Sequence, residues 1–158
     1  MSSSYIVYCY YYYSTAPPLP SPQAFWDSLV DDLSITNPCY VRVSRVLVEV
    51  RDGLMDLSGQ RDAGAIREII DPEFIQEQAS RGSYDWATAV RLIGAIVGVI
   101  QRIQAPCRDA DTAAKWAAVQ ASLGPLVPPA EQPAAFCKAL EFLLKRVNVM
   151  RIDAANAR

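Results

Sequence analysis

The stretch YVRVSRVLVEVRDGLMDL, residues 40–57, decides the fold class of this chain. Its VRV and VLVEV pieces alternate as a half-buried strand would. The apolar residues also fall on one stripe at helical spacing, which comprises Val43, Val46, Leu47, Val50, Leu54 and Leu57. Because strands rarely exceed about ten residues, the length of the segment favours a helix. With this segment helical, the sequence predicts no strand.

Helices are predicted on both sides of this segment. Ser21-Pro22, Asp71-Pro72 and Asp85 carry the residue types that begin helices, and Gly82 can supply a left-handed end. Apolar periodicity places the further helices at about 21–34, 63–70, 71–82, 85–103, 107–121 and 133–155. The predicted fold is all-α, an irregular bundle of six or seven helices. Gly94 and Gly98 form a G-x-x-x-G in the most apolar helix, which predicts a close helix crossing in the core.

The chain divides into two parts by composition. Residues 1–20 hold six of the eight tyrosines, followed by Pro17, Pro18 and Pro20. We expect this head to be disordered, although a strand added to another sheet or a ligand for a proline-binding module are alternatives. Residues 21–158 are predicted to form a single α-helical domain, a suitable size for one core.

Composition excludes several functional classes. The formal net charge of −2 gives no basic excess, so we expect no nucleic-acid partner. The absence of histidine excludes His-dependent triads and His-ligated zinc. The longest apolar run, Leu92 to Ile100, is too short for a membrane span, which needs about 20 residues. Cys9, Cys39, Cys107 and Cys137 could form two disulfides in a secreted chain, but because no signal peptide is visible we expect reduced thiols in a cytoplasmic protein.

Residues that could carry chemistry are few. Asp31-Asp32 and Asp109-x-Asp111 are carboxylate pairs, best explained by exposed helix faces or favourable charges near helix N-termini. Cys107 lies beside Arg108, but no partner base is evident. No phosphate-binding glycine loop occurs. We therefore predict no catalytic, cofactor or metal site, and expect a helical binding or regulatory module rather than an enzyme.

Three stretches, in order, resemble the T-complex protein 11 family of eukaryotic α-helical proteins. The first, VSRVLVEVRDGLMDL (43–57) leading to IREIIDPEFIQEQASRGSYD (66–85), is similar to the family's VLLEVKEILLSL and I-x-E-x-L-D-x-x-L-I-x-Q-Q-A-x-H-G-A-L-D. The second and third, APCRD (105–109) and MRIDAAN (150–156), are similar to CAPVRDE and MKMDMAN. The chain departs from the family pattern at Arg81, Gln104 and Ala154-Ala155. Family members usually continue well beyond this last motif, so the chain is a short member, a divergent subunit or an incomplete gene model.

The resemblance implies a non-catalytic, all-α regulatory protein associated with signal transduction through cAMP and protein kinase A, and in animals with the flagellum. The alternative hypothesis is a structural subunit of a large assembly, such as a flagellar or organellar complex. In either case we expect protein partners to bind exposed apolar helix faces, with self-association possible. The family's motifs transfer no binding role to individual residues.

The motif residues themselves suggest a structural network. Arg108 and Asp109 are neighbours in sequence and cannot face one another on a helix. We expect Arg108 to reach a carboxylate or helix-end carbonyls, and Asp109 to reach the N–H groups of its own helix. Arg151 and Asp153 are the candidate partners. We predict that Arg108, Asp109, Arg151, Asp153 and Asn156 belong to a buried network that fixes how three helices meet.

Overall fold

The computed structural model describes residues 21–158, which form an up-and-down bundle of α-helices without strands. The helices are α2 (Pro22–Ser34), α3 (Val41–Ser58), α4 (Gln60–Ile69), α5 (Pro72–Ser80), α6 (Trp86–Ile103), α7 (Asp109–Gln120) and α8 (Gln132–Asn156), with a short 3-10 helix at Pro106–Arg108. This confirms the predicted all-α fold. The predicted disordered head, residues 1–20, lies outside the described residues.

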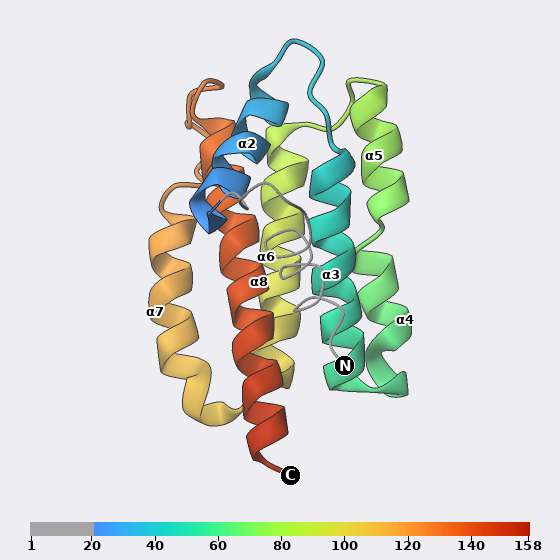
Figure 1. Ribbon diagram of the computed structural model, residues 1–158, viewed down its shortest axis with the longest axis vertical. Coiled ribbons are helices and arrows are strands. Elements are labelled where there is room, and N and C mark those ends of the chain that lie inside the picture. Colours follow the sequence, from blue (N-terminus) through green and yellow to red (C-terminus); the bar gives the residue numbers. More distant parts are fainter. Residues whose placement is uncertain (1–20) are drawn as a thin grey trace.

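The segment that decided the fold class is helical. Val43, Val46, Leu47, Val50 and Leu54 of α3 are all buried, as the helical stripe predicts. The helix ends at Gly59, whose φ of 73° is a left-handed conformation that glycine adopts without a steric penalty. This corner turns the chain back into α4, and α4 and α5 then follow one another along α3 (Figure 1).

Local capping explains where three other helices begin. The side chains of Ser21, Asp71 and Asp85 accept hydrogen bonds from the backbone N–H groups of Ala24, Phe74 and Thr88, respectively. Each cap satisfies an N–H group that the first turn of a helix leaves without an intrahelical partner. The predicted starts of these helices are therefore confirmed. The predicted helix 107–121 instead begins with the 3-10 turn, because Pro106 follows the extended residue Ala105.

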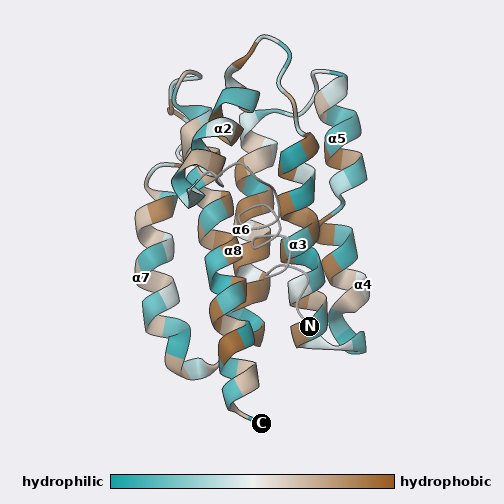
Figure 2. Ribbon diagram, in the orientation of Figure 1, coloured by the Kyte–Doolittle hydropathy of each residue, from teal (hydrophilic) through white to brown (hydrophobic). Residues whose placement is uncertain are grey.

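Helices α3, α6 and α8 form the centre of the bundle, with α2, α4, α5 and α7 around them (Figure 1). The largest fully buried side chains in the core come mainly from these three, including Leu47, Leu54, Ile93, Ile100, Leu140 and Leu143. Figure 2 shows hydrophobic residues along α6, between the surrounding helices. Of the described residues, only α6 is long and apolar enough to cross a membrane by length and composition. Its place in the bundle core is consistent with the expected lack of a membrane span.

The prediction for the G-x-x-x-G of α6 is wrong. Gly94 is exposed, and a Cβ atom built at Gly94 or Gly98 would meet nothing within 4 Å. The close helix approach occurs at Gly53 of α3, where a Cβ atom would lie 2.5 Å from Val147 Cγ1 of α8. Spacing places two glycines on one face, but it does not determine which helix, if any, faces them.

Candidate functional site

The motif residue Arg108 pairs with Asp153 across the bundle. Its Nε and Nη2 donate to the two carboxylate oxygens of Asp153 at 2.9 and 2.8 Å, which joins the 3-10 turn to α8. The hydrogen bonds from Arg108 lower the pKa of the Asp153 carboxyl group, and Asp153 in turn raises the pKa of Arg108. The Arg108 side chain is 40% exposed, so this pair lies at the surface rather than in the predicted buried network.

The buried polar centre is Arg146 of α8, which is only 3% exposed. Its Nη1 donates to Asp111 and its Nη2 to the hydroxyl of Thr112, both at 2.8 Å. The Thr112 hydroxyl donates to Gln104 Oε1 at 2.6 Å, and Gln104 Nε2 donates to Asp109 at 2.8 Å. These five residues, here called the Arg146 network, connect α8, α7 and the end of α6.

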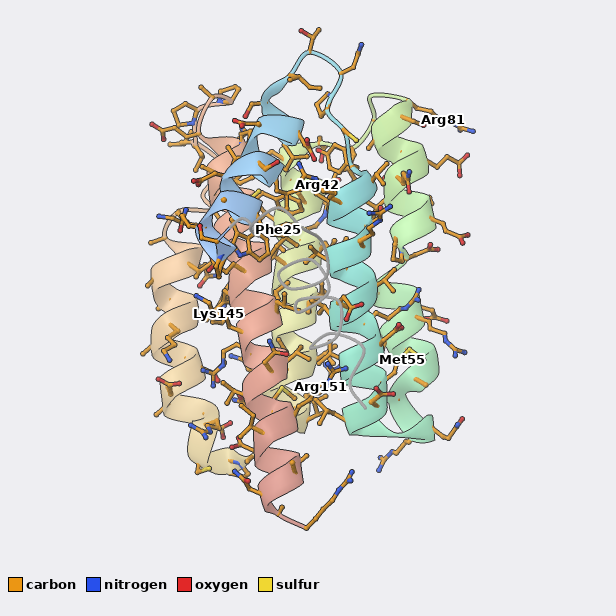
Figure 3. All side chains as sticks on the ribbon, in the orientation of Figure 1. Phe25, Arg42, Met55, Arg81, Lys145 and Arg151 are labelled. Atoms are coloured by element: carbon orange, nitrogen blue, oxygen red, sulfur yellow. The ribbon has the colours of Figure 1, made fainter. Side chains whose placement is uncertain are left out.

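Asp109, Arg151 and Asn156 lie differently from the prediction. The Asp109 carboxylate accepts from Gln104, not from the N–H groups of α7 as the sequence suggested. Arg151 lies away from Arg108 and faces α3, where its Nη2 is 3.7 Å from Asp56 Oδ2. Figure 3 shows Arg151 between α8 and α3. Asn156 is exposed at the last residue of α8 and takes part in none of these bonds.

Arg151 of α8 and Glu49 of α3 form a second polar region, between these two helices. Gly53 makes room for Arg151, since a Cβ atom there would lie 3.0 Å from Arg151 Nη2. Both Nη atoms of Arg151 and Oε2 of Glu49 are buried and hydrogen-bond to no described residue. Burial raises the pKa of Glu49, although the nearby positive charge of Arg151 opposes the shift.

The two helix-face carboxylate pairs are also partly engaged. Asp32 accepts from Arg42 Nε at 2.7 Å, which joins α2 to α3. Asp111 accepts from both Lys115 and Arg146, and these hydrogen bonds lower its pKa. One member of each pair, Asp32 or Asp111, therefore pairs with an arginine of another helix and ties the two helices together.

The cysteines and possible metal ligands are dispersed. Cys39 and Cys107 are exposed and Cys137 is buried, and these three form no disulfide. Burial raises the pKa of the Cys137 thiol to about 12, so it stays protonated at neutral pH. Within residues 21–158, no group of three or more Cys, Asp or Glu side chains is placed to hold a metal ion.

Sequence reasoning missed Arg146, Gln104, Thr112 and Asp111 as network members. A signal for Arg146 was present, because an arginine stands among Leu143, Leu144 and Val147 on the most buried face of α8. A charged residue on such a face is rarely buried without a partner.

Two hollows lie outside these polar clusters. The α5–α6 groove, of about 280 Å³, runs between α6 and the α4–α5 side and contains Ile69, Phe74, Ile75, Leu92 and Ala95. The aromatic cavity, of about 180 Å³, lies where α3, α6 and α8 begin and is lined by Tyr40, Tyr84, Trp86 and Phe136.

Comparison with known families covers the whole described domain. A family model with the description T-complex protein 11 matches residues 21–158. No solved structure matches the chain.

Proposed function

The chain belongs to the T-complex protein 11 family, and on this premise we propose that it is a non-catalytic helical module that regulates or scaffolds another protein by direct contact. The proposed setting is signal transduction linked to cAMP and protein kinase A, in the cytoplasm or the flagellum. This setting is supported by the family resemblance alone, whereas the mode of contact is supported by the surface of the bundle.

The observation that carries the mode of contact is the α5–α6 groove. Phe74 is 53% exposed at its edge, and partly buried Ile69 and Leu92 lie within it. Ala95 lines the groove on the exposed face of α6, and beside it Gly94, which has no side chain, leaves the helix backbone accessible. An apolar hollow flanked by an exposed aromatic side chain is typical of protein-interaction surfaces.

The ligand that fits this groove is an amphipathic helix. Its apolar face would cover Phe74 and Leu92, and its polar flanks would meet Glu68 and Arg91, which also line the groove. Glu68 and Asp71 carry negative charge on the α4–α5 side of the groove and Arg91 carries positive charge on α6, so a helix with a basic residue on one flank and an acidic residue on the other suits the groove best. Rim charges of this kind affect orientation and association rate more than affinity.

The test uses Phe74→Ser in the full-length chain. Affinity purification from cells, followed by binding of the identified partner as a purified protein, should show at least a tenfold loss of affinity for this variant. Ile152→Ser is the matched control, because Ile152 is 58% exposed on α8, away from the groove. Equal binding by Phe74→Ser and the wild type would contradict the proposed contact.

The same purification separates the two hypotheses on function. A partner that is a kinase, a kinase subunit or a cyclic-nucleotide-binding protein supports the regulatory role. Stoichiometric recovery with salt-resistant components of a flagellar or organellar complex would instead support the structural subunit.

A further inference from the structure

The aromatic cavity is a preformed hollow at one end of the bundle. Tyr40 and Tyr84 pack edge to face with ring centroids 5.6 Å apart and an interplanar angle of 79°. The Trp86 indole N–H donates to the carbonyl oxygen of Gly124 at 3.0 Å, which fixes the ring against the α7–α8 loop. Prolines from two loops, Pro38 and Pro129, complete the wall and restrict its backbone. A ligand would therefore lose little free energy in reorganising the walls.

The polar groups around this cavity include hydrogen-bond donors as well as the acceptors of Asp85 and Gln132. The Tyr84 hydroxyl is buried and hydrogen-bonds to no described residue. Helices α3 and α8 both begin here, and neither has an N-cap side chain that accepts from its first turn. The carboxylate of Asp85 is already engaged in capping α6, through the Thr88 N–H at 2.7 Å. A suitable ligand supplies carbonyl oxygens, and the partial positive charge of helix N-termini favours such groups.

Proline-rich segments meet this requirement. Each proline offers a carbonyl acceptor and an apolar ring but no backbone N–H, so it brings no donor that would be buried without a partner. Aromatic-lined hollows are the usual binding sites for such segments. Five large hydrophobic residues are exposed in the described chain, and three of them lie in loops or at a helix start beside the cavity: Ile35, Val41 and Leu126. These three can extend the contact with a bound segment.

We propose that the aromatic cavity binds the segment Pro17–Pro20, sequence PPLP, of a second copy of this chain. The PPLP segment of the same molecule is too close to the start of α2 to reach the cavity. Leu33, at the cavity, lies about 18 Å along α2 from Ser21. Pro20 is next to Ser21, and four extended residues span only about 14 Å, so the segment cannot be seated in its own cavity as a unit.

The test measures peptide binding and self-association with the full-length protein. A synthetic peptide of residues 14–23 is titrated into ¹⁵N-labelled protein while the Trp86 indole N–H resonance is followed, and light scattering is recorded over a range of protein concentrations. We expect the peptide to shift the Trp86 resonance and the mass to rise with concentration. A peptide with Pro17, Pro18 and Pro20 replaced by Ala should bind at least tenfold more weakly, and the chain carrying these substitutions should stay monomeric.

Pro129→Ala removes one exposed proline ring from the wall of the cavity and should weaken peptide binding several-fold. Phe74→Ser is the control that leaves peptide affinity unchanged, which also separates this proposal from the function proposed for the α5–α6 groove. The proposal is overturned if the Trp86 resonance does not shift, if the Ala-substituted peptide binds as well as the native one, or if the wild-type chain is monomeric at every concentration.

Discussion

At the scale of single residues, the hydroxyl of Thr112 is the link on which the Arg146 network depends. It accepts from Arg146 and donates to Gln104, and both Thr112 and Arg146 are buried. Without this hydroxyl, one N–H of the Arg146 guanidinium and the side-chain amide oxygen of Gln104 would be buried without partners. Leaving such groups unsatisfied is more costly than the net value of the hydrogen bonds themselves.

We therefore predict that Thr112→Val, which keeps the side-chain shape, lowers the free energy of unfolding by roughly 1–3 kcal/mol. Thr36→Val, at an exposed position in the loop between α2 and α3, should change it by no more than about 0.5 kcal/mol. Urea unfolding followed by circular dichroism measures both. Equal stabilities of the two variants would show that water replaces the Thr112 hydroxyl.

Arg108→Ala should shift the midpoint of thermal unfolding less than Thr112→Val does. The sequence motif gave Arg108 the larger role, but its side chain is 40% exposed and its salt bridge to Asp153 is accessible to solvent. Exposed ion pairs contribute little to stability because water screens them. A larger shift for Arg108→Ala in thermal unfolding at low salt would contradict this order.

Glu49 gives a prediction about pH. Its folded pKa is raised by burial, so the folded state favours the protonated carboxyl group. The stability that this group supports is present below its unfolded pKa, near 4.5, and is lost as pH rises through the higher folded pKa. Glu49→Gln should thus be more stable than the wild type at neutral pH, with the difference shrinking towards about pH 4. Urea unfolding at both pH values tests this, and a difference independent of pH would refute it.

At the scale of helices, two glycines within long helices have opposite roles. A Cβ atom at Gly53 would overlap Val147 of α8, whereas one at Gly94 would enter open space. Gly53→Ala should therefore destabilise the fold by roughly 1–3 kcal/mol through overpacking. Gly94→Ala should stabilise it by up to about 1 kcal/mol, because alanine favours the helical conformation. Thermal unfolding of the two variants measures the contrast, and shifts of the same sign would contradict it.

The helices were predictable where short-range interactions determine them. Ser21, Asp71 and Asp85 cap groups three residues away, and the α3 stripe repeats within each turn, so a linear sequence contains these relations. The Arg108–Asp153 and Arg146–Asp111 bonds join residues 45 and 35 positions apart, and their geometry depends on how α7 packs on α8. The exposure of Gly94 likewise depends on which helices surround α6, and local periodicity does not contain that information.

At the scale of the whole molecule, the packing predicts one cooperative unfolding transition. Helix α8 contacts α2, α3, α6 and α7, and the buried hydrophobic residues of the described helices form one cluster. The three tryptophans lie on α2, α6 and α7 and report on separate parts of the bundle. Three variants each keep a single tryptophan: Trp26, Trp86 or Trp116. In each of them, the denaturation midpoint measured by fluorescence should equal the midpoint measured by circular dichroism. Midpoints that still differ would reveal independent subdomains.

The central place of α8 also has a consequence for biosynthesis. Every other described helix precedes α8 in the chain, yet α2, α3, α6 and α7 all pack against it. At the ribosome, chains grow by about 5–20 residues per second. The synthesis of Gln132–Asn156 therefore takes more than a second, during which the earlier helices lack α8 as a packing partner. During this interval the apolar faces of α3 and α6 are available to chaperones. A chain whose synthesis ends within α8 would be unable to complete its hydrophobic core.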